Sequence, residues 1–154
     1  MTDRITELPY SEIDRIEPMW RELTEYNAAT STHFADYFRS FTFTTRKSFM
    51  DEKIAHGAVI RTFWVEDIGF CTINYDLAAH MGAVEMLYVR PTARGGGWGR
   101  KLMDAGLAAL REQGIARISI EVAFGNANAF SFYEKYGFAP FTVNLLPSDI
   151  AEEP

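Results

Sequence analysis

The feature that most constrains the fold is a strand, a glycine-rich loop and a helix in direct succession within residues 83–114. Residues 83–89 are apolar apart from one glutamate, which is typical of a strand covered on both faces. The helix after the loop carries apolar residues at helical spacing and ends at a glycine. Alternating apolar and polar residues over 117–122 then predict another strand. A strand, a crossover helix and a strand of this length form a parallel, right-handed βαβ unit.

The N-terminal half predicts helices followed by an antiparallel hairpin. A Ser-x-x-Asp capping box at Ser11 predicts the start of a first helix, which Pro18 is expected to kink early. A second helical region is predicted within residues 32–56. Residues 58–65 and 68–75 are rich in β-branched and aromatic side chains, and an acidic dipeptide separates them. This pattern indicates two paired strands.

The C-terminal part predicts a last helix over residues 126–136, which ends at Gly137, and a final strand over residues 141–146. The complete order of elements is that of an α+β fold with a mixed, mostly antiparallel sheet. At 154 residues the chain has the length of one domain, so we expect a single domain over residues 1–154.

Charge and composition exclude several classes of function. Fifteen lysines and arginines against twenty-one acidic residues give a net charge of −6, which disfavours a broad nucleic-acid-binding surface. No stretch approaches the roughly 18 apolar residues of a membrane span, and the start lacks a secretory signal, so we expect a cytoplasmic protein without membrane contact. His33, His56 and His80 have no ligand spacing to a second metal-binding residue, so no metal site is expected. The single cysteine, Cys71, cannot form an internal disulfide.

The glycine-rich loop predicts a phosphate-binding site. Glycines allow backbone amides to approach a ligand closely, and the amides of a first helical turn lack internal partners. Residues 90–101 carry four basic side chains and no acidic one, against the overall negative charge. The loop lacks the Gly-Lys-Ser/Thr ending of a P-loop and the third glycine of a dinucleotide fingerprint, which disfavours ATP, GTP and NAD. The alternative is a flexible glycine turn with solvated arginines.

Two motifs carry a resemblance to a known family. The first reads Leu87-Tyr88-Val89-x-Pro91 followed by Arg94-x-x-Gly97-x-Gly99. The second reads Asn126-x-x-Ala129-x-x-x-Tyr133-Glu134-Lys135-x-Gly137-Phe138. At this separation, the two motifs resemble the GCN5-related N-acetyltransferase (GNAT) family. Residues 83–139 carry the resemblance, whereas the first 80 residues match only in the order of their elements.

The resemblance implies acetyl-coenzyme A as the cofactor. Its pyrophosphate would lie on the amides of Arg94–Arg100, and its pantetheine arm would pair with Leu87–Val89 as an added strand. Family members splay this strand from its neighbour, and an amide near Leu87 would polarise the thioester oxygen. Asn126 matches an asparagine that contacts the cofactor arm, and it also suits a helix N-cap. The implied cofactor contacts are Leu87, Tyr88, Val89, Arg94, Gly95, Gly96, Gly97, Gly99, Arg100, Asn126 and Tyr133.

Two side chains are candidates for the proton transfers that acetylation of an amine requires. A primary amine of pKa about 10.4 must lose a proton at pH 7, whereas a thiol near 8.5 is a better leaving group, so the base matters more. Glu85 is the one residue of strand 83–89 that is charged at pH 7 and is the candidate base, directly or through water; the alternative is an edge-exposed or ion-paired glutamate. Tyr133 matches the family position of the acid that protonates the thiolate; the alternative is a core aromatic residue.

The resemblance implies an enzyme, an N-acetyltransferase that transfers the acetyl group directly to a primary amine of a small molecule or a peptide in a ternary complex. The alternatives are a non-catalytic coenzyme A sensor and an acyltransferase with a different acyl chain or acceptor. Residues 1–36 carry eight carboxylates against three arginines, which would suit a cationic amine such as a polyamine, an aminoglycoside or a lysine; a solvated helix face explains the same charges. A homodimer would follow the family's tendency.

Overall fold

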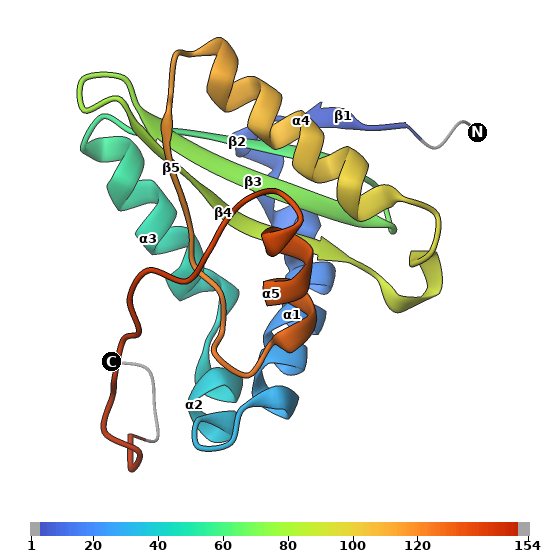
Figure 1. Ribbon diagram of the computed structural model, residues 1–154, viewed down its shortest axis with the longest axis vertical. Coiled ribbons are helices and arrows are strands. Elements are labelled where there is room, and N and C mark those ends of the chain that lie inside the picture. Colours follow the sequence, from blue (N-terminus) through green and yellow to red (C-terminus); the bar gives the residue numbers. More distant parts are fainter. Residues whose placement is uncertain (1–3, 151–154) are drawn as a thin grey trace. The chain divides into compact units, whose positions relative to one another are not determined.

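The computed structural model describes residues 4–150, which contain a five-stranded sheet of order β1-β2-β3-β4-β5 (Figure 1). The strands are β1 (Thr6–Leu8), β2 (Val59–Val65), β3 (Gly69–Asp76), β4 (Met81–Val89) and β5 (Arg117–Ile120). Neighbours from β1 to β4 run antiparallel, whereas β4 and β5 run parallel. This confirms the predicted α+β fold with a mixed, mostly antiparallel sheet, and it confirms the predicted hairpin.

Five α-helices accompany the sheet in the described residues. They are α1 (Glu17–Thr30), α2 (Ala35–Ser40), α3 (Phe43–Ala55), α4 (Trp98–Glu112) and α5 (Ala127–Glu134). Helix α4 connects β4 to the parallel strand β5, which confirms the βαβ unit. Figure 1 shows α3 and α4 on opposite faces of the sheet. No helix within residues 4–150 is long and apolar enough to cross a membrane.

Contacts divide the chain into two compact units. The larger unit contains the chain up to Glu22 and Phe43–Glu121, and therefore the whole sheet with α3 and α4. The smaller unit contains Leu23–Thr42 and the chain from Val122 onward, and therefore α2 and α5. The single domain over residues 1–154 stays a prediction.

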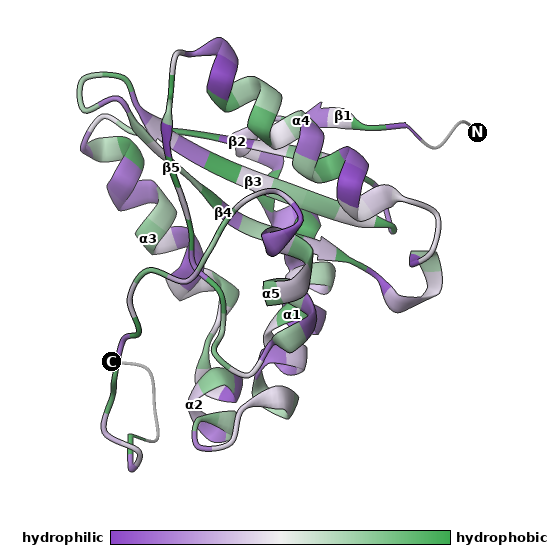
Figure 2. Cartoon of the chain, in the orientation of Figure 1, coloured by the Kyte–Doolittle hydropathy of each residue, from purple (hydrophilic) through white to green (hydrophobic). Residues whose placement is uncertain are grey.

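Helix α4 packs closely on the sheet because a glycine lies at the contact. Its apolar residues Leu102, Met103, Leu107 and Leu110 are buried, and Figure 2 shows hydrophobic and hydrophilic residues on different sides of this helix. A Cβ atom at Gly106 would lie 2.9 Å from the Sγ of Cys71 on β3. A larger residue here would push the helix away from the strand, so this mid-helix glycine serves packing.

The N-terminal prediction was partly wrong. Ser11 makes no side-chain cap; Tyr10–Ile16 form a 3₁₀ helix, and the α-helix begins only at Glu17. Pro18 therefore lies in the first turn of α1, where its missing N–H has no intrahelical role, rather than at a kink. The helical region within 32–56 is two helices, α2 and α3. The three-residue edge strand β1 was not predicted, because so short a segment carries no readable alternation.

The predicted final strand over residues 141–146 was also wrong. In the described chain this segment contains no strand, and Phe141 and Leu145 are 95% and 86% exposed. Pro140 and Pro147 border the segment and cannot donate backbone hydrogen bonds. A segment of alternating apolar residues forms a strand only where its backbone can hydrogen-bond to a neighbouring strand. No such neighbour is present among the described residues.

Candidate active site

Strands β4 and β5 separate halfway along β4. Their parallel pairing extends from Met81, opposite Arg117, to Val84, opposite Ile120. The other edge of β4 stays paired with β3 as far as Val89. Over residues 85–89 the edge facing away from β3 is therefore not paired with any strand among the described residues. Its main-chain groups can receive an extended ligand as an added strand.

A β-bulge lies where the two strands separate. Ile73 pairs with Val84 and the preceding residue Thr72 pairs with Met86, so Glu85 is the extra residue on β4. A bulge changes the direction of a side chain and increases the local twist of its strand. The bulge therefore sets the direction of the Glu85 side chain. It also lies at the start of the stretch of β4 whose edge is open.

The side chain of Glu85 is ion-paired and only 3% exposed. Its carboxylate accepts hydrogen bonds from Arg46 and Lys53 of α3 and from Asn74 of β3. A carboxylate offers about four acceptor positions; three donors take three of them here, and burial of the side chain closes the remaining one to solvent. An amine that gives a proton to Glu85 must first displace one of these donors. The role of Glu85 as a base stays a prediction.

Sequence reasoning missed Arg46, Lys53 and Asn74. Arg46 and Lys53 are seven residues apart, which places them on one face of a helix. This spacing indicates a basic face on the helix, but it does not show whether that face lies against solvent or against the sheet. Asn74 could not be found, because its place opposite Glu85 depends on the register of β3 and β4.

The glycine-rich loop presents backbone amides at the start of α4. Gly97 is the N-cap residue with a φ of 78°, no side chain caps the helix, and Gly95 has a φ of 90°. A Cβ atom at either glycine would meet no atom within 4 Å, so the loop backbone borders open space. The first amides of α4 have no intrahelical acceptor, and the helix dipole is positive at this end. This geometry fits a pyrophosphate group.

The four basic residues of the loop region are not equivalent. The Arg90 guanidinium pairs with Glu22 at 3.0 Å and with Asp67 at 3.3 Å. The Nε of Arg94 donates to the carbonyl oxygen of Val89 at 3.2 Å, and the ammonium of Lys101 lies 4.7 Å from the centre of the Trp98 ring. Arg90 therefore serves the fold, and the local excess of positive charge beside the loop is smaller than the sequence indicates.

Tyr88 contributes its backbone to the open edge, whereas its side chain is buried. The hydroxyl donates a hydrogen bond to Glu22 at 3.1 Å. Burial, followed by this hydrogen bond to a carboxylate, raises the pKa of Tyr88 to about 12. Leu87 and Val89 are half-buried, so the face of β4 that carries them is only partly covered, whereas the sequence predicted a strand covered on both faces.

The raised pKa of Tyr88 predicts a pH dependence of stability. Because the folded protein holds the phenolic proton more tightly than the unfolded chain, this stabilisation is complete below about pH 10 and is lost as the pH rises toward 12. The free energy of unfolding should therefore fall more steeply between pH 10 and 12 in the wild type than in Tyr88→Phe. Urea denaturation at each pH measures this free energy. If the unfolding free energies of the two proteins change in parallel with pH, the raised pKa of Tyr88 is contradicted.

Asn126 and Tyr133 lie in the smaller unit. Asn126 is the N-cap of α5, and its Oδ1 accepts a hydrogen bond from the backbone N–H of Ala129 at 3.1 Å, as a capping residue does. Tyr133 lies on α5 with its ring centre 5.4 Å from that of Phe132. Their contacts to the cofactor stay predictions.

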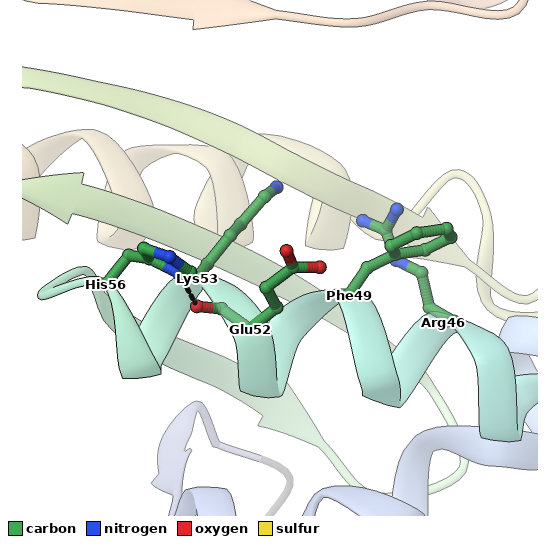
Figure 3. A pocket seen from close by; sticks show the side chains of 5 residues that line it. All are labelled: Arg46, Phe49, Glu52, Lys53 and His56. Atoms are coloured by element: carbon green, nitrogen blue, oxygen red, sulfur yellow. Dashed lines mark hydrogen bonds between the residues drawn. The ribbon is translucent and has the colours of Figure 1, made fainter.

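A groove runs along the exposed side of α3, next to the Glu85 cluster. It has a volume of about 520 Å³, and Figure 3 shows the side chains that line it. They are Arg46, Phe49, Glu52, Lys53 and His56. Arg46 and Lys53 thus border the groove and also contact Glu85. No group of three metal-binding side chains occurs within residues 4–150.

The acetyltransferase (GNAT) family matches residues 12–138, and the chain belongs to this family. This confirms the resemblance. Mycothiol acetyltransferases from Salinispora tropica and Streptomyces avermitilis are 44% and 38% identical over 69 and 81 residues. These stretches are 44% and 53% of this chain but 22% and 26% of the relatives. The chain thus spans about a quarter of the length of the curated relatives it matches.

Solved structures share the fold at low identity. The PaiA N-acetyltransferase from Thermoplasma acidophilum, solved in complex with coenzyme A, has a TM-score of 0.68 at 20% identity and covers 94% of both chains. A GCN5-related N-acetyltransferase from Ralstonia eutropha has a TM-score of 0.67 at 14% identity and covers 95% of this chain and 98% of that one. At these identities the likeness establishes the fold.

Proposed function

We propose that this chain transfers the acetyl group of acetyl-coenzyme A to a primary amine in a ternary complex. The observation that carries the proposal is the open edge of β4 over residues 85–89, followed directly by a glycine-rich loop and the uncapped start of α4. An added strand and an anion site in succession suit an elongated ligand with a phosphorylated end. Acetyl-coenzyme A has this form, and family membership supports the choice.

The chain's own groups have separate tasks in this proposal. The amides of Arg94–Arg100 bind the pyrophosphate, and the main chain of Leu87–Val89 orients the arm. An amide near Leu87 donates to the thioester oxygen, where negative charge develops. When bound, acetyl-coenzyme A supplies the activated acetyl group. Glu85 receives the amine proton, directly or through water, after the acceptor has displaced one of its present donors. Tyr133 gives a proton to the departing thiolate.

Substitution of Gly97 tests the placement of the pyrophosphate. Gly97→Val forces a β-branched residue into a left-handed conformation and places methyl groups beside the amides, so acetyl-coenzyme A should bind about tenfold more weakly. Gly114→Val is the matched control, because Gly114 has a similar φ of 74° and similar open space but lies at the other end of α4. Calorimetric titration measures both affinities. Equal losses in the two variants would refute the placement.

A coenzyme A-binding protein without turnover is a second candidate, because the ion pairs of Arg46 and Lys53 occupy the candidate base. Following free thiol release with a panel of amines decides between the two. An amine that raises thiol release above hydrolysis supports the transferase. Tight cofactor binding without any such amine supports the second candidate.

A further inference from the structure

We propose that the groove along α3 binds the acceptor, and that the acceptor carries a carboxylate as well as its amine. The inference rests on the proposed function and names its substrate class. The class is that of amino acids and their close analogues, rather than polyamines.

The charges beside the groove favour an anionic group on the ligand. Arg46 and Lys53 share the single carboxylate of Glu85, so neither cation has a carboxylate partner to itself among the described residues. In addition, the Nε of Arg46 is buried and has no hydrogen-bond partner among the described residues. A ligand carboxylate bound to this pair would give the two cations a second anionic partner through charge-assisted hydrogen bonds. The second ammonium of a polyamine would instead meet two cations.

The ammonium of such an acceptor has a place at Glu85. The Nζ of Lys53 is a primary ammonium on this carboxylate, and the Lys53 side chain is 47% exposed, so it has room to move. An incoming ammonium can replace Nζ on Glu85 while Lys53 turns to the ligand carboxylate. A zwitterion exchanges partners in this way and leaves every charged group paired, which an amine lacking a carboxylate cannot do. The exchange also places the reacting amine on the candidate base.

The size and the apolar part of the groove agree with a small acceptor. It is an open groove with a volume of about 520 Å³, which gives room for a small acceptor. Phe49 lies between Arg46 and Lys53 along α3 and is 49% exposed, so an apolar side chain of the ligand can cover it. Glu52 also lines the groove.

The test compares amines that differ only in the carboxylate: phenylalanine with phenethylamine, leucine with isopentylamine, and lysine with cadaverine. In at least one pair the carboxylate-bearing amine should have a kcat/KM for thiol release about tenfold or more above its partner. The preference should disappear in Arg46→Gln and in Lys53→Gln. Lys47→Gln is the matched control on the same helix, because Lys47 pairs with Asp14 and should leave the preference unchanged.

Binding separates this inference from the proposed function. Calorimetry with coenzyme A present measures the affinity of each pair without turnover, and thermal melts show whether each variant is folded. If no amine is acetylated but the carboxylate still strengthens binding through Arg46, the inference holds and the transferase fails. If amines are acetylated without preference for the carboxylate in any pair, the inference is wrong and the transferase stands. If amines are bound without that preference and none is acetylated, both are wrong.

Discussion

Tyr133→Phe is expected to lower kcat about a hundredfold at pH 7, with little change in the affinity for acetyl-coenzyme A. In the proposed function the hydroxyl of Tyr133 protonates the departing thiolate, and a positioned general acid contributes a factor of about 10²–10⁴. A thiol pKa near 8.5 means that the proton matters less at higher pH, so the defect should shrink above about pH 8.5. Thiol release at saturating amine, measured from pH 6.5 to 9.5, gives the profile.

The control is Tyr136→Phe, which removes the other tyrosine hydroxyl near Phe132. It should retain nearly all activity, because the family motif gives Tyr136 no role. A defect in Tyr133→Phe that does not change with pH would indicate a packing role for Tyr133. Wild-type activity in Tyr133→Phe would show that Tyr133 is not the general acid.

Gly69→Ala is expected to lower the free energy of unfolding by about 3 kcal/mol, because the strands leave no room for one methyl group. A Cβ atom at Gly69 would lie 2.5 Å from the carbonyl oxygen of Tyr88 and 3.2 Å from the Cα of Val89, which are backbone atoms of β4. Backbone cannot rotate away as a side chain can, so β3 and β4 must shift. Chemical denaturation followed by circular dichroism measures the loss.

The control for Gly69 is Gly114→Ala. Gly114 has a φ of 74°, and a Cβ atom there would meet nothing within 4 Å, so only the conformational cost of about 1 kcal/mol applies. A smaller loss in Gly69→Ala than in Gly114→Ala would contradict the steric argument. Because the shift falls at Tyr88 and Val89, Gly69→Ala should also weaken acetyl-coenzyme A binding, whereas Gly114→Ala should not.

Much of the βαβ unit could be predicted from local patterns. Each pattern lies within a few residues: the apolar run of β4, the glycines of the loop and the helical spacing of α4. Such patterns depend on backbone conformation and on which side is buried, and both are largely set by neighbours in the chain. The predictions of the N-terminal helix boundary and of a strand over residues 141–146 were wrong, because helix capping and strand pairing depend on partners elsewhere in the chain.

The sequence by itself determined that a glycine-rich anion site follows directly on an apolar strand and opens a helix. It also determined the family through the two motifs. The tertiary structure alone decided the bulge at Glu85, the separation of β4 from β5 after Val84, and the pairing of Glu85 with Arg46 and Lys53. The physical reason is that strand register and the packing of α3 join residues far apart in the chain, and a local pattern carries no information about such contacts.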